Sequence, residues 1–240
     1  MSTPILEYRN FSKTYKNGRR AVDSLSLQVM PGDIYGFIGQ NGAGKTTSLR
    51  SAAGVLDFTE GDILINGVSI NADPVACKKI TAYIPDNPDI YEYLTGQQYL
   101  NFISDIYSVP DRESVIGRYA EEFTIADRLG GLISSYSHGM RQKTAIIAEL
   151  IHDPKLMLLD EPFVGLDPMA TFTLRKRLTA LCESGGAVFF STHILEVAQK
   201  FCNKIAVIKA GRLVASGDTE EVCGSRDLEA VFMELQATEE

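Results

Sequence analysis

The sequence has no tryptophan, and its 240 residues include only four cysteines and three histidines. The cysteines show no C-x-x-C spacing, so the sequence indicates neither a zinc site nor a disulfide framework. Reduced, unpaired thiols are the simpler interpretation, and they favour a cytosolic setting. The four are Cys77, Cys182, Cys202 and Cys223.

Long apolar runs are also missing. No stretch approaches the roughly 18 to 20 residues that a helix needs to span a bilayer. Residues 1–7 lack the basic and apolar regions of a signal peptide. Any role at a membrane is therefore expected to come through a partner.

Basic residues are in deficit, because 23 Lys and Arg stand against 31 Asp and Glu and give a formal net charge of -8. A surface of that sign repels the phosphates of nucleic acids, so we do not expect a DNA- or RNA-binding protein. The length is sufficient for one large domain or two modest ones, each with a buried core.

One glycine-rich stretch carries most of the functional information. Residues 39–46 read GQNGAGKT and match G-x-x-x-x-G-K-[ST], a loop that wraps backbone amides around nucleotide phosphates. Residues 33–38 predict a strand before the loop and residues 47–53 a helix after it, which is the context that the motif requires. The alternative is a glycine-rich turn with a surface lysine, and it does not account for these flanks.

Each residue type in this loop has a physical role. Glycines allow positive φ and close backbone approach, so amides and the positive end of the helix can face a polyphosphate. Lys45 would bring an ammonium to the β- and γ-phosphates, and the Thr46 hydroxyl would ligate Mg²⁺. The predicted nucleotide-binding residues of this stretch are Gly39, Gln40, Asn41, Gly42, Ala43, Gly44, Lys45, Thr46 and Thr47.

The rest of the chain divides by its hydrophobic pattern. Residues 5–38 predict a β-rich segment, and a further strand pair is expected at 62–70. Residues 96–124 have a helical pattern, with Tyr99, Phe102, Ile103 and Ile106 expected on one side of a helix. From residue 155, apolar strands alternate with helices, which predicts a parallel sheet buried on both faces.

The last segment, residues 218–240, places apolar residues among acids and predicts one or two amphipathic helices. These helices could cover the core or a partner protein, and the pattern does not distinguish the two. The apolar positions are Val222, Leu228, Val231, Phe232 and Leu235.

Two carboxylates follow an apolar strand predicted at residues 156–159. Asp160 then lies at the carboxyl edge of the parallel sheet, where the ligands of such sheets bind. We expect Asp160 to hold Mg²⁺ through water and Glu161 to orient and deprotonate an attacking water. A strand that ends in two acids is commonplace, but downstream of a phosphate-binding loop it predicts a catalytic function.

Three further motifs complete a resemblance. Residues 136–140 (YSHGM), followed by Arg-Gln-Lys and an apolar helix, resemble the signature motif of ATP-binding cassette (ABC) ATPases. Residues 160–162 (DEP) lead into residues 165–168 (GLDP), which are similar to the D-loop of that family. Residues 191–193 (STH) resemble its switch histidine. The resemblance covers residues 5 to about 217.

The resemblance implies a fold and a domain organisation. The fold is α/β, with a P-loop NTPase core of ABC type, an antiparallel β subdomain and a helical signature subdomain. Residues 1–240 would form one nucleotide-binding domain. Its core and β subdomain would comprise residues 1–95 and 155–217, with a helical subdomain at 96–154 and a helical tail at 218–240.

The resemblance also implies residue roles. Two such domains are expected to pair head to tail, as a homodimer or heterodimer, so that Ser137 and Gly139 of one close over the γ-phosphate held by Lys45 of the other. A helix N-terminus after Ser137 suits an anion. Asp167, in the D-loop, is also expected at the nucleotide. Together with Lys45, Glu161 and His193 are the expected catalytic residues. His193 would stabilise the γ-phosphate and Glu161, unless it is only a surface histidine at a strand end.

Tyr15 is expected to stack on the adenine, because it stands where the family has an aromatic residue. The alternative is ordinary packing of an aromatic side chain on a strand.

Two departures from the family pattern stand out. Asp86 replaces the glutamine that begins the lid loop; its carboxylate can still approach Mg²⁺, but its role in orienting water is open. In the signature, His138 replaces the first glycine and Met140 the final glutamine, whereas Ser137 and Gly139 are retained.

The lid region, residues 88–94, mixes aromatic side chains with carboxylates. In the family this region borders the groove that receives a helix of the membrane subunit. Tyr91 and Tyr93 are suitable anchors for such a helix. The alternative is that they are two ordinary loop tyrosines.

We therefore expect an ATPase that binds ATP and Mg²⁺ as the ATP-hydrolysing subunit of an ABC transporter. It would sit peripherally on the cytoplasmic face of the membrane and drive transport, in the export direction, through a separately encoded integral membrane subunit. One alternative is an ABC ATPase of a soluble machine without a transport function. The other is a non-enzymatic scaffold gated by nucleotide. The presence of a base beside the γ-phosphate argues against it.

Overall fold

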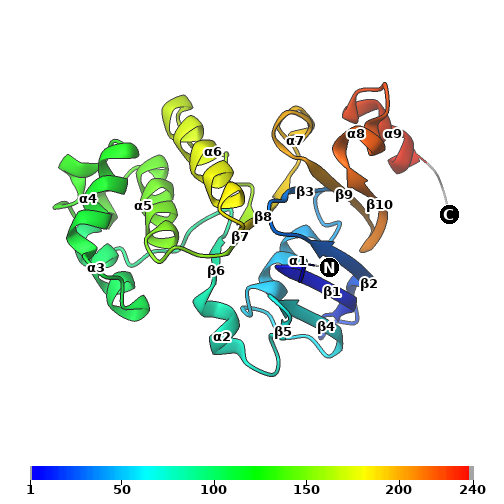
Figure 1. The fold of residues 1–240 in the computed structure, drawn as a ribbon, viewed down its shortest axis with the longest axis horizontal. Helices are drawn as coiled ribbons and strands as arrows, with labels where there is room; N and C mark the ends of the chain where they lie inside the picture. The colour runs from blue at the N-terminus through cyan, green and yellow to red at the C-terminus, as the bar shows by residue number, and fades with distance from the viewer. Residues whose placement is uncertain (1, 238–240) are drawn as a thin grey trace.

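The structure, a computed structural model, describes residues 2–237 (Figure 1). Met1 and residues 238–240, at the two ends of the expected domain and tail, lie outside the described part. The helices α3, α4 and α5 gather at one end of the molecule, and the C-terminal helices α8 and α9 lie at the other (Figure 1). No helix in the described part is long and apolar enough to cross a membrane.

The predicted β-rich segment forms a four-stranded antiparallel sheet in the order β2-β1-β4-β5. Tyr8 on β1 lies opposite Leu27 on β2 and Ile63 on β4, so all three apolar residues share one buried face. Asn66 and Gly67 both have positive φ in the β4–β5 turn, as the Asn-Gly pair predicts. The strands are β1 (Leu6–Thr14), β2 (Arg20–Val29), β4 (Glu60–Ile65) and β5 (Val68–Ser69).

The second sheet has six strands in the order β10-β9-β3-β8-β7-β6. Every pair in it is parallel except β9 with β10, and every residue of β3, β7 and β8 is buried, as the continuous apolar runs predict. The strands are β3 (Ile34–Ile38), β6 (Thr81–Ile84), β7 (Leu156–Asp160), β8 (Ala187–Thr192), β9 (Lys204–Lys209) and β10 (Arg212–Asp218).

The hydrophobic core has two main parts. One lies between the two sheets and around α1 (Lys45–Ala52), where Tyr8, Phe11, Phe37 and Phe189 are fully enclosed. The other joins the opposite face of the six-stranded sheet to the helices of the signature subdomain and to α6 (Pro168–Glu183) and α7 (Leu195–Phe201). The short helix α2 (Pro74–Lys79) precedes β6.

The region predicted to be helical contains α3 (Gly96–Tyr107), α4 (Arg112–Glu122) and α5 (His138–Leu150), with 3-10 turns at Ala126–Arg128 and Ile133–Ser135. Thr95 begins α3 through a reciprocal capping box with Gln98.

The predicted inner face of α3 is partly wrong. Its most deeply buried positions are Gly96, Leu100 and Ser104, whereas Phe102 and Ile106 are exposed. Gly96, Leu100 and Ser104 are spaced four residues apart and lie on one side of α3, which packs inward, so the larger Phe102 and Ile106 side chains point toward solvent.

The C-terminal segment forms α8 (Thr219–Cys223) and α9 (Leu228–Ala237). Leu228 and Val231 are buried, and α9 packs against α7. The described part of the tail therefore covers the core of its own chain.

Candidate functional site

The loop between β3 and α1 has a backbone that only glycine suits. Gly42 and Gly44 have φ of 81° and 112°, and Gly44 begins α1 in the left-handed region. Gly39 is required for a different reason, since a Cβ there would lie 2.6 Å from the carbonyl oxygen of Ile208. A Cβ on Gly44 would lie 2.6 Å from the carbonyl oxygen of Ala21. The loop is therefore held tightly between β9 and β2.

Lys45 lies over this loop. Its Nζ donates hydrogen bonds to the carbonyl oxygens of Gly39 at 2.6 Å and Gln40 at 3.2 Å. Burial lowers the pKa of Lys45, and the nearby carboxylates of Glu161 and Asp160 oppose that shift. The ammonium is thus already positioned inside the loop, where a phosphate would give it a stronger partner than two carbonyl groups.

Tyr15 and the residues after the loop border a common hollow of about 250 Å³. The Tyr15 hydroxyl is 3.1 Å from Thr47 Oγ1, and the side chain is 38% exposed. The ring is therefore anchored at its tip and open to a ligand along its side. The hollow is lined by Tyr15, Arg19, Ala21, Gly42, Gly44, Lys45, Thr46 and Thr47.

Arg19 belongs to this site and was not predicted. Its Nη2 donates a 3.2 Å hydrogen bond to the carbonyl oxygen of Gly42, which adds a second cation to the hollow that holds Lys45. The sequence shows only a turn with two arginines at 19 and 20. The fold decides that Arg19 reaches the loop, whereas Arg20 pairs with Asp23.

The two predicted carboxylates lie at the end of β7. Asp160 is 3% exposed and accepts a hydrogen bond from Ser191 Oγ on the neighbouring strand β8. Glu161 has a positive φ of 50°, and its amide donates to both the carbonyl and the hydroxyl oxygen of Ser191 at 3.2 Å. Ser191 therefore fixes both acids. It lies inside the STH motif, but no role for it was predicted.

Glu161 and His193 contact each other. Glu161 Oε1 is 2.8 Å from His193 Nδ1, and Glu161 Oε2 accepts from the His193 amide at 3.4 Å. The glutamate side chain is 14% exposed and the imidazole 59%, so the acid is sheltered while the histidine faces outward. His193 follows directly after the end of β8 and is exposed, so its role at the γ-phosphate stays a prediction.

Thr46, Asp86 and Asp160 line one hollow of about 400 Å³. A hydroxyl and two carboxylates are the hard oxygen donors that Mg²⁺ prefers, so these residues fit the ion. The residues that the structure describes contain no group of three or more His, Cys, Asp or Glu that could hold a metal ion. Phosphate and water oxygens would have to complete the coordination, as is usual for Mg²⁺.

The signature residues lie at the start of α5. Ser137 caps this helix, and its Oγ accepts a 3.3 Å hydrogen bond from the Met140 amide. The His138 ring lies against Gly165, where an added Cβ would be 2.6 Å from His138 Cδ2. The signature therefore packs on the D-loop. Ser137 and Gly139 do not line the hollow that contains Lys45.

Asp167 has two partners within its own chain. Its Oδ1 accepts from the Ala170 amide at 2.9 Å as the cap of α6, and its Oδ2 is 2.6 Å from Lys143 Nζ on α5. The hydrogen bond from Lys143 is the main reason that the pKa of Asp167 is lowered. Asp167 thus ties the signature helix to α6, and its expected contact with nucleotide remains a prediction.

The comparisons with known proteins agree on one family. A family model described as ABC transporter matches residues 22–164. The chain is 36% identical over 211 residues to the uncharacterized ABC transporter ATP-binding protein YhcH of Bacillus subtilis (strain 168), a match that covers 88% of this chain and 68% of YhcH. It is 33% identical over 219 residues to the ABC-type transporter ATP-binding protein EcsA of the same organism, which covers 88% of this chain and 89% of EcsA.

Solved structures give the same result. A solved structure of the ATP-binding subunit of an ABC transporter matches this chain with a TM-score of 0.91 and 30% sequence identity. The match covers 96% of this chain and 99% of that chain. The ATP-binding cassette MJ0796, solved as a dimer in a post-hydrolysis state with ADP and Pi, matches with a TM-score of 0.80 and 23% sequence identity. This match covers 89% of this chain and 98% of that chain, and it supports the fold alone. This chain belongs to the ABC transporter family as an ATP-binding subunit.

Proposed function

We propose that this chain hydrolyses ATP and so drives transport of a substrate, in the export direction, through a separately encoded membrane subunit. The observation that carries the proposal is the contact between Glu161 and His193 at 2.8 Å, at the end of the strand that also presents Asp160. A protein that only bound nucleotide would not need a sheltered carboxylate beside the phosphate-binding loop.

Each residue of the site has an expected role. Lys45 and the loop amides hold the phosphates, and Glu161 takes the proton of the attacking water. His193 orients the Glu161 carboxylate and faces outward, where it can contact the γ-phosphate. When Mg²⁺ is bound, it neutralises the charge that develops on the phosphates, and Thr46, Asp86 and Asp160 would hold it.

The complete site requires a second ABC domain. Ser137 and Gly139 stand at the N-terminus of α5, which suits an anion, yet they do not line their own chain's nucleotide hollow. A head-to-tail pair, of two identical or two different domains, would bring this helix end to the partner's γ-phosphate. Asp167 would lie near the same interface.

The membrane subunit is proposed to dock on exposed aromatic side chains. The Tyr91 ring is 6.0 Å from Tyr93 and 5.9 Å from Phe102, and these three side chains are 47%, 77% and 43% exposed. Such a cluster fits the apolar face of a short helix. The chain would then lie on the cytoplasmic face of the membrane without entering it. Export rests on the departures at His138, Met140 and Asp86.

Co-purification tests the transporter proposal. The tagged chain would be extracted from native membranes in mild detergent, and its partners would be identified by mass spectrometry. A multi-spanning protein at near-equal stoichiometry is expected. Only soluble partners would favour a machine without a transport function.

A double change, Tyr91→Ala with Tyr93→Ala, tests the docking surface. It should abolish this co-purification, whereas Met233→Ala, which alters an equally exposed side chain on α9, should preserve it. Retention of the membrane protein by the tyrosine variant would contradict the proposed docking surface.

A further inference from the structure

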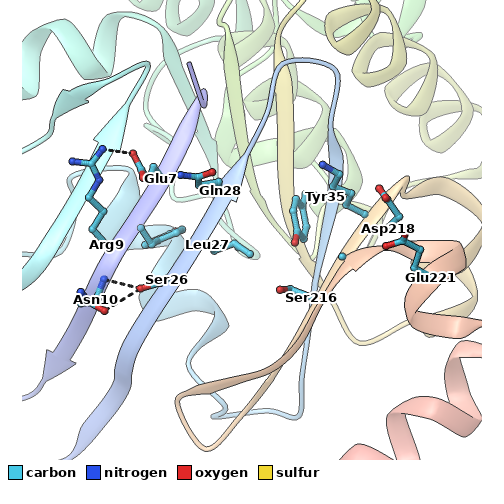
Figure 2. A pocket seen from close by; sticks show the side chains of 13 residues that line it. Glu7, Arg9, Asn10, Ser26, Leu27, Gln28, Tyr35, Ser216, Asp218 and Glu221 are labelled. Carbon is cyan, nitrogen blue, oxygen red and sulfur yellow. Dashed lines mark hydrogen bonds and ion pairs between the residues drawn. The ribbon is translucent and has the colours of Figure 1, made fainter. Parts of the chain in front are cut away.

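Two hollows that the described residues form outside the nucleotide site have volumes of about 660 and 650 Å³. One, of about 660 Å³, lies between the outer sheet and β10 (Figure 2). Much of its polar lining is already paired: Arg9 and Gln28 donate to Glu7 at 2.7 and 2.8 Å, and Ser26 bonds to Asn10. These groups need no ligand.

The second hollow, of about 650 Å³, lies between α2, the end of α3 and the segment after α5. None of its lining residues is acidic, although acids outnumber bases in the chain. It therefore differs in charge from most of the surface. Its lining residues are Val75, Lys78, Lys79, Ile106, Tyr107, Ser108 and His152.

His152 is the unusual member of this group. Its side chain is only 1% exposed, and neither ring nitrogen has a hydrogen-bond partner among the described residues. Glu149 Oε2 is 3.7 Å from Nε2, too far for a hydrogen bond, and it already accepts from the Tyr83 amide. Buried polar groups in folded proteins are nearly always paired. The imidazole therefore has an unused capacity to bind a ligand atom.

Tyr107 covers one face of this imidazole. The two rings are stacked, with centroids 3.9 Å apart and an angle of 9° between their planes. Both residues also line a neighbouring hollow of about 410 Å³ that includes Arg118. A rotation of the Tyr107 side chain would give a ligand in either hollow access to His152.

The remaining walls specify the ligand's chemistry. Lys78 and Lys79 supply two cations, while Val75 and Ile106 are 62% and 59% exposed and form an apolar rim. We propose that this groove binds an amphiphilic anion, in which a phosphate or carboxylate head group is joined to an aliphatic chain. The head contacts Lys78, Lys79 and His152, and the chain lies along Val75 and Ile106. A free alkyl anion and an anionic bilayer lipid share this chemistry.

Monomeric dodecyl phosphate is the first probe, with titration calorimetry to measure affinity and NMR to follow the histidine ring signals. The Lys45→Ala background removes the other phosphate-binding site. We expect binding that shifts the His152 ring signals. The double change Lys78→Gln with Lys79→Gln should weaken binding at least about tenfold, as expected for the loss of a charge-assisted hydrogen bond. His152→Gln tests the imidazole separately.

Lys176→Gln with Lys200→Gln is the matched control, because it removes two exposed lysines on α6 and α7 and should leave the affinity unchanged. Thermal melts check that every variant folds. Unchanged His152 signals, or equal weakening by the control pair, would overturn the proposal. So would equally tight binding of inorganic phosphate or of neutral dodecyl maltoside, or binding of an acidic peptide in place of the alkyl phosphate.

Vesicles distinguish the two sources of the anion. Sedimentation with phosphatidic acid vesicles but not with phosphatidylcholine vesicles, lost in the Lys78 and Lys79 variant, would identify a bilayer lipid. Binding of monomeric dodecyl phosphate without vesicle binding would identify a free amphiphile. Either result supports the shared chemistry, and failure of both arms refutes it without bearing on ATP hydrolysis.

Discussion

Replacement of Glu161 by glutamine removes the proposed general base but keeps the shape of the side chain. The Glu161 amide is held by two 3.2 Å hydrogen bonds to Ser191, so the backbone should stay in place in the variant. Glutamine has the same shape and can still contact His193 Nδ1, but it cannot accept the proton of an attacking water. The loss should therefore be that of a general base, about 10²–10⁴-fold in turnover, or about 3–5 kcal/mol of barrier.

ATP binding should behave differently from turnover. Glu161 does not line the hollow that contains Lys45, and its negative charge acts on that lysine from nearby. Removal of the charge also removes a repulsion toward the γ-phosphate, so affinity should stay equal or rise slightly. Phosphate release measures turnover, and a fluorescent ATP analogue measures the dissociation constant.

Glu121→Gln, at an exposed position on α4, provides the matched control and should leave both quantities unchanged. Turnover by Glu161→Gln within about threefold of the unaltered chain would refute the assignment of Glu161 as the base. A large loss of ATP affinity would instead show that Glu161 has a structural role in the phosphate-binding loop.

Three further predictions follow from single contacts. Gly44→Ala places a Cβ 2.6 Å from the Ala21 carbonyl oxygen at a φ of 112°. It should lower the free energy of unfolding by about 2 kcal/mol or more, measured by urea titration, and impair ATP binding, measured by nucleotide titration. Arg19→Gln removes the donor to Gly42 and should weaken ATP binding by about tenfold, whereas Arg20→Gln, which alters an arginine outside the hollow, should not. Asp167→Asn removes a carboxylate whose pKa is lowered mainly by Lys143. The stability that it contributes is present above the ordinary pKa of aspartate and is lost as the pH falls through the lowered value. The difference in urea midpoint between the two proteins should therefore be clear at neutral pH and shrink as the pH falls through that lowered value.

Local patterns predicted most of the fold. The strands β3, β7 and β8 are continuous apolar runs, and helix α6 begins with an Asp-Pro cap, so each is specified within a few residues. The inner face of α3 was not predicted correctly. Apolar residues occur on both sides of that helix, and tertiary packing buries the side that carries Gly96, Leu100 and Ser104.

The loop at 39–46 could be predicted from a local motif, and the family resemblance pairs Glu161 with His193, although they are 32 residues apart. Their catalytic roles stay predictions. The contacts of Ser191 with Asp160 and of Arg19 with Gly42 could not be predicted, because neither a motif nor the resemblance assigned them. These pairings depend on the strand order, which no local pattern specifies.

The unusual signature of this chain is accommodated by a glycine on the D-loop. His138 stands where a glycine was expected, and its ring occupies the space beside Gly165 that a side chain would need. Gly165→Ala should therefore destabilise the protein for two reasons: a Cβ 2.6 Å from the ring and a φ of +79°. Gly185→Ala isolates the second, because Gly185 has a φ of +93° with nothing within 4 Å of its added Cβ.

Because the His138 ring is the far end of an exposed side chain and can turn aside, the clash should add no more than about 1 kcal/mol to the loss seen at Gly185. His138→Gly should restore Gly165→Ala to the stability of Gly185→Ala while leaving Gly185→Ala itself unimproved. Urea unfolding of the single and double variants measures the coupling between the positions. If the two effects simply add, His138 does not depend on Gly165, and the departure from the expected signature would need another physical account.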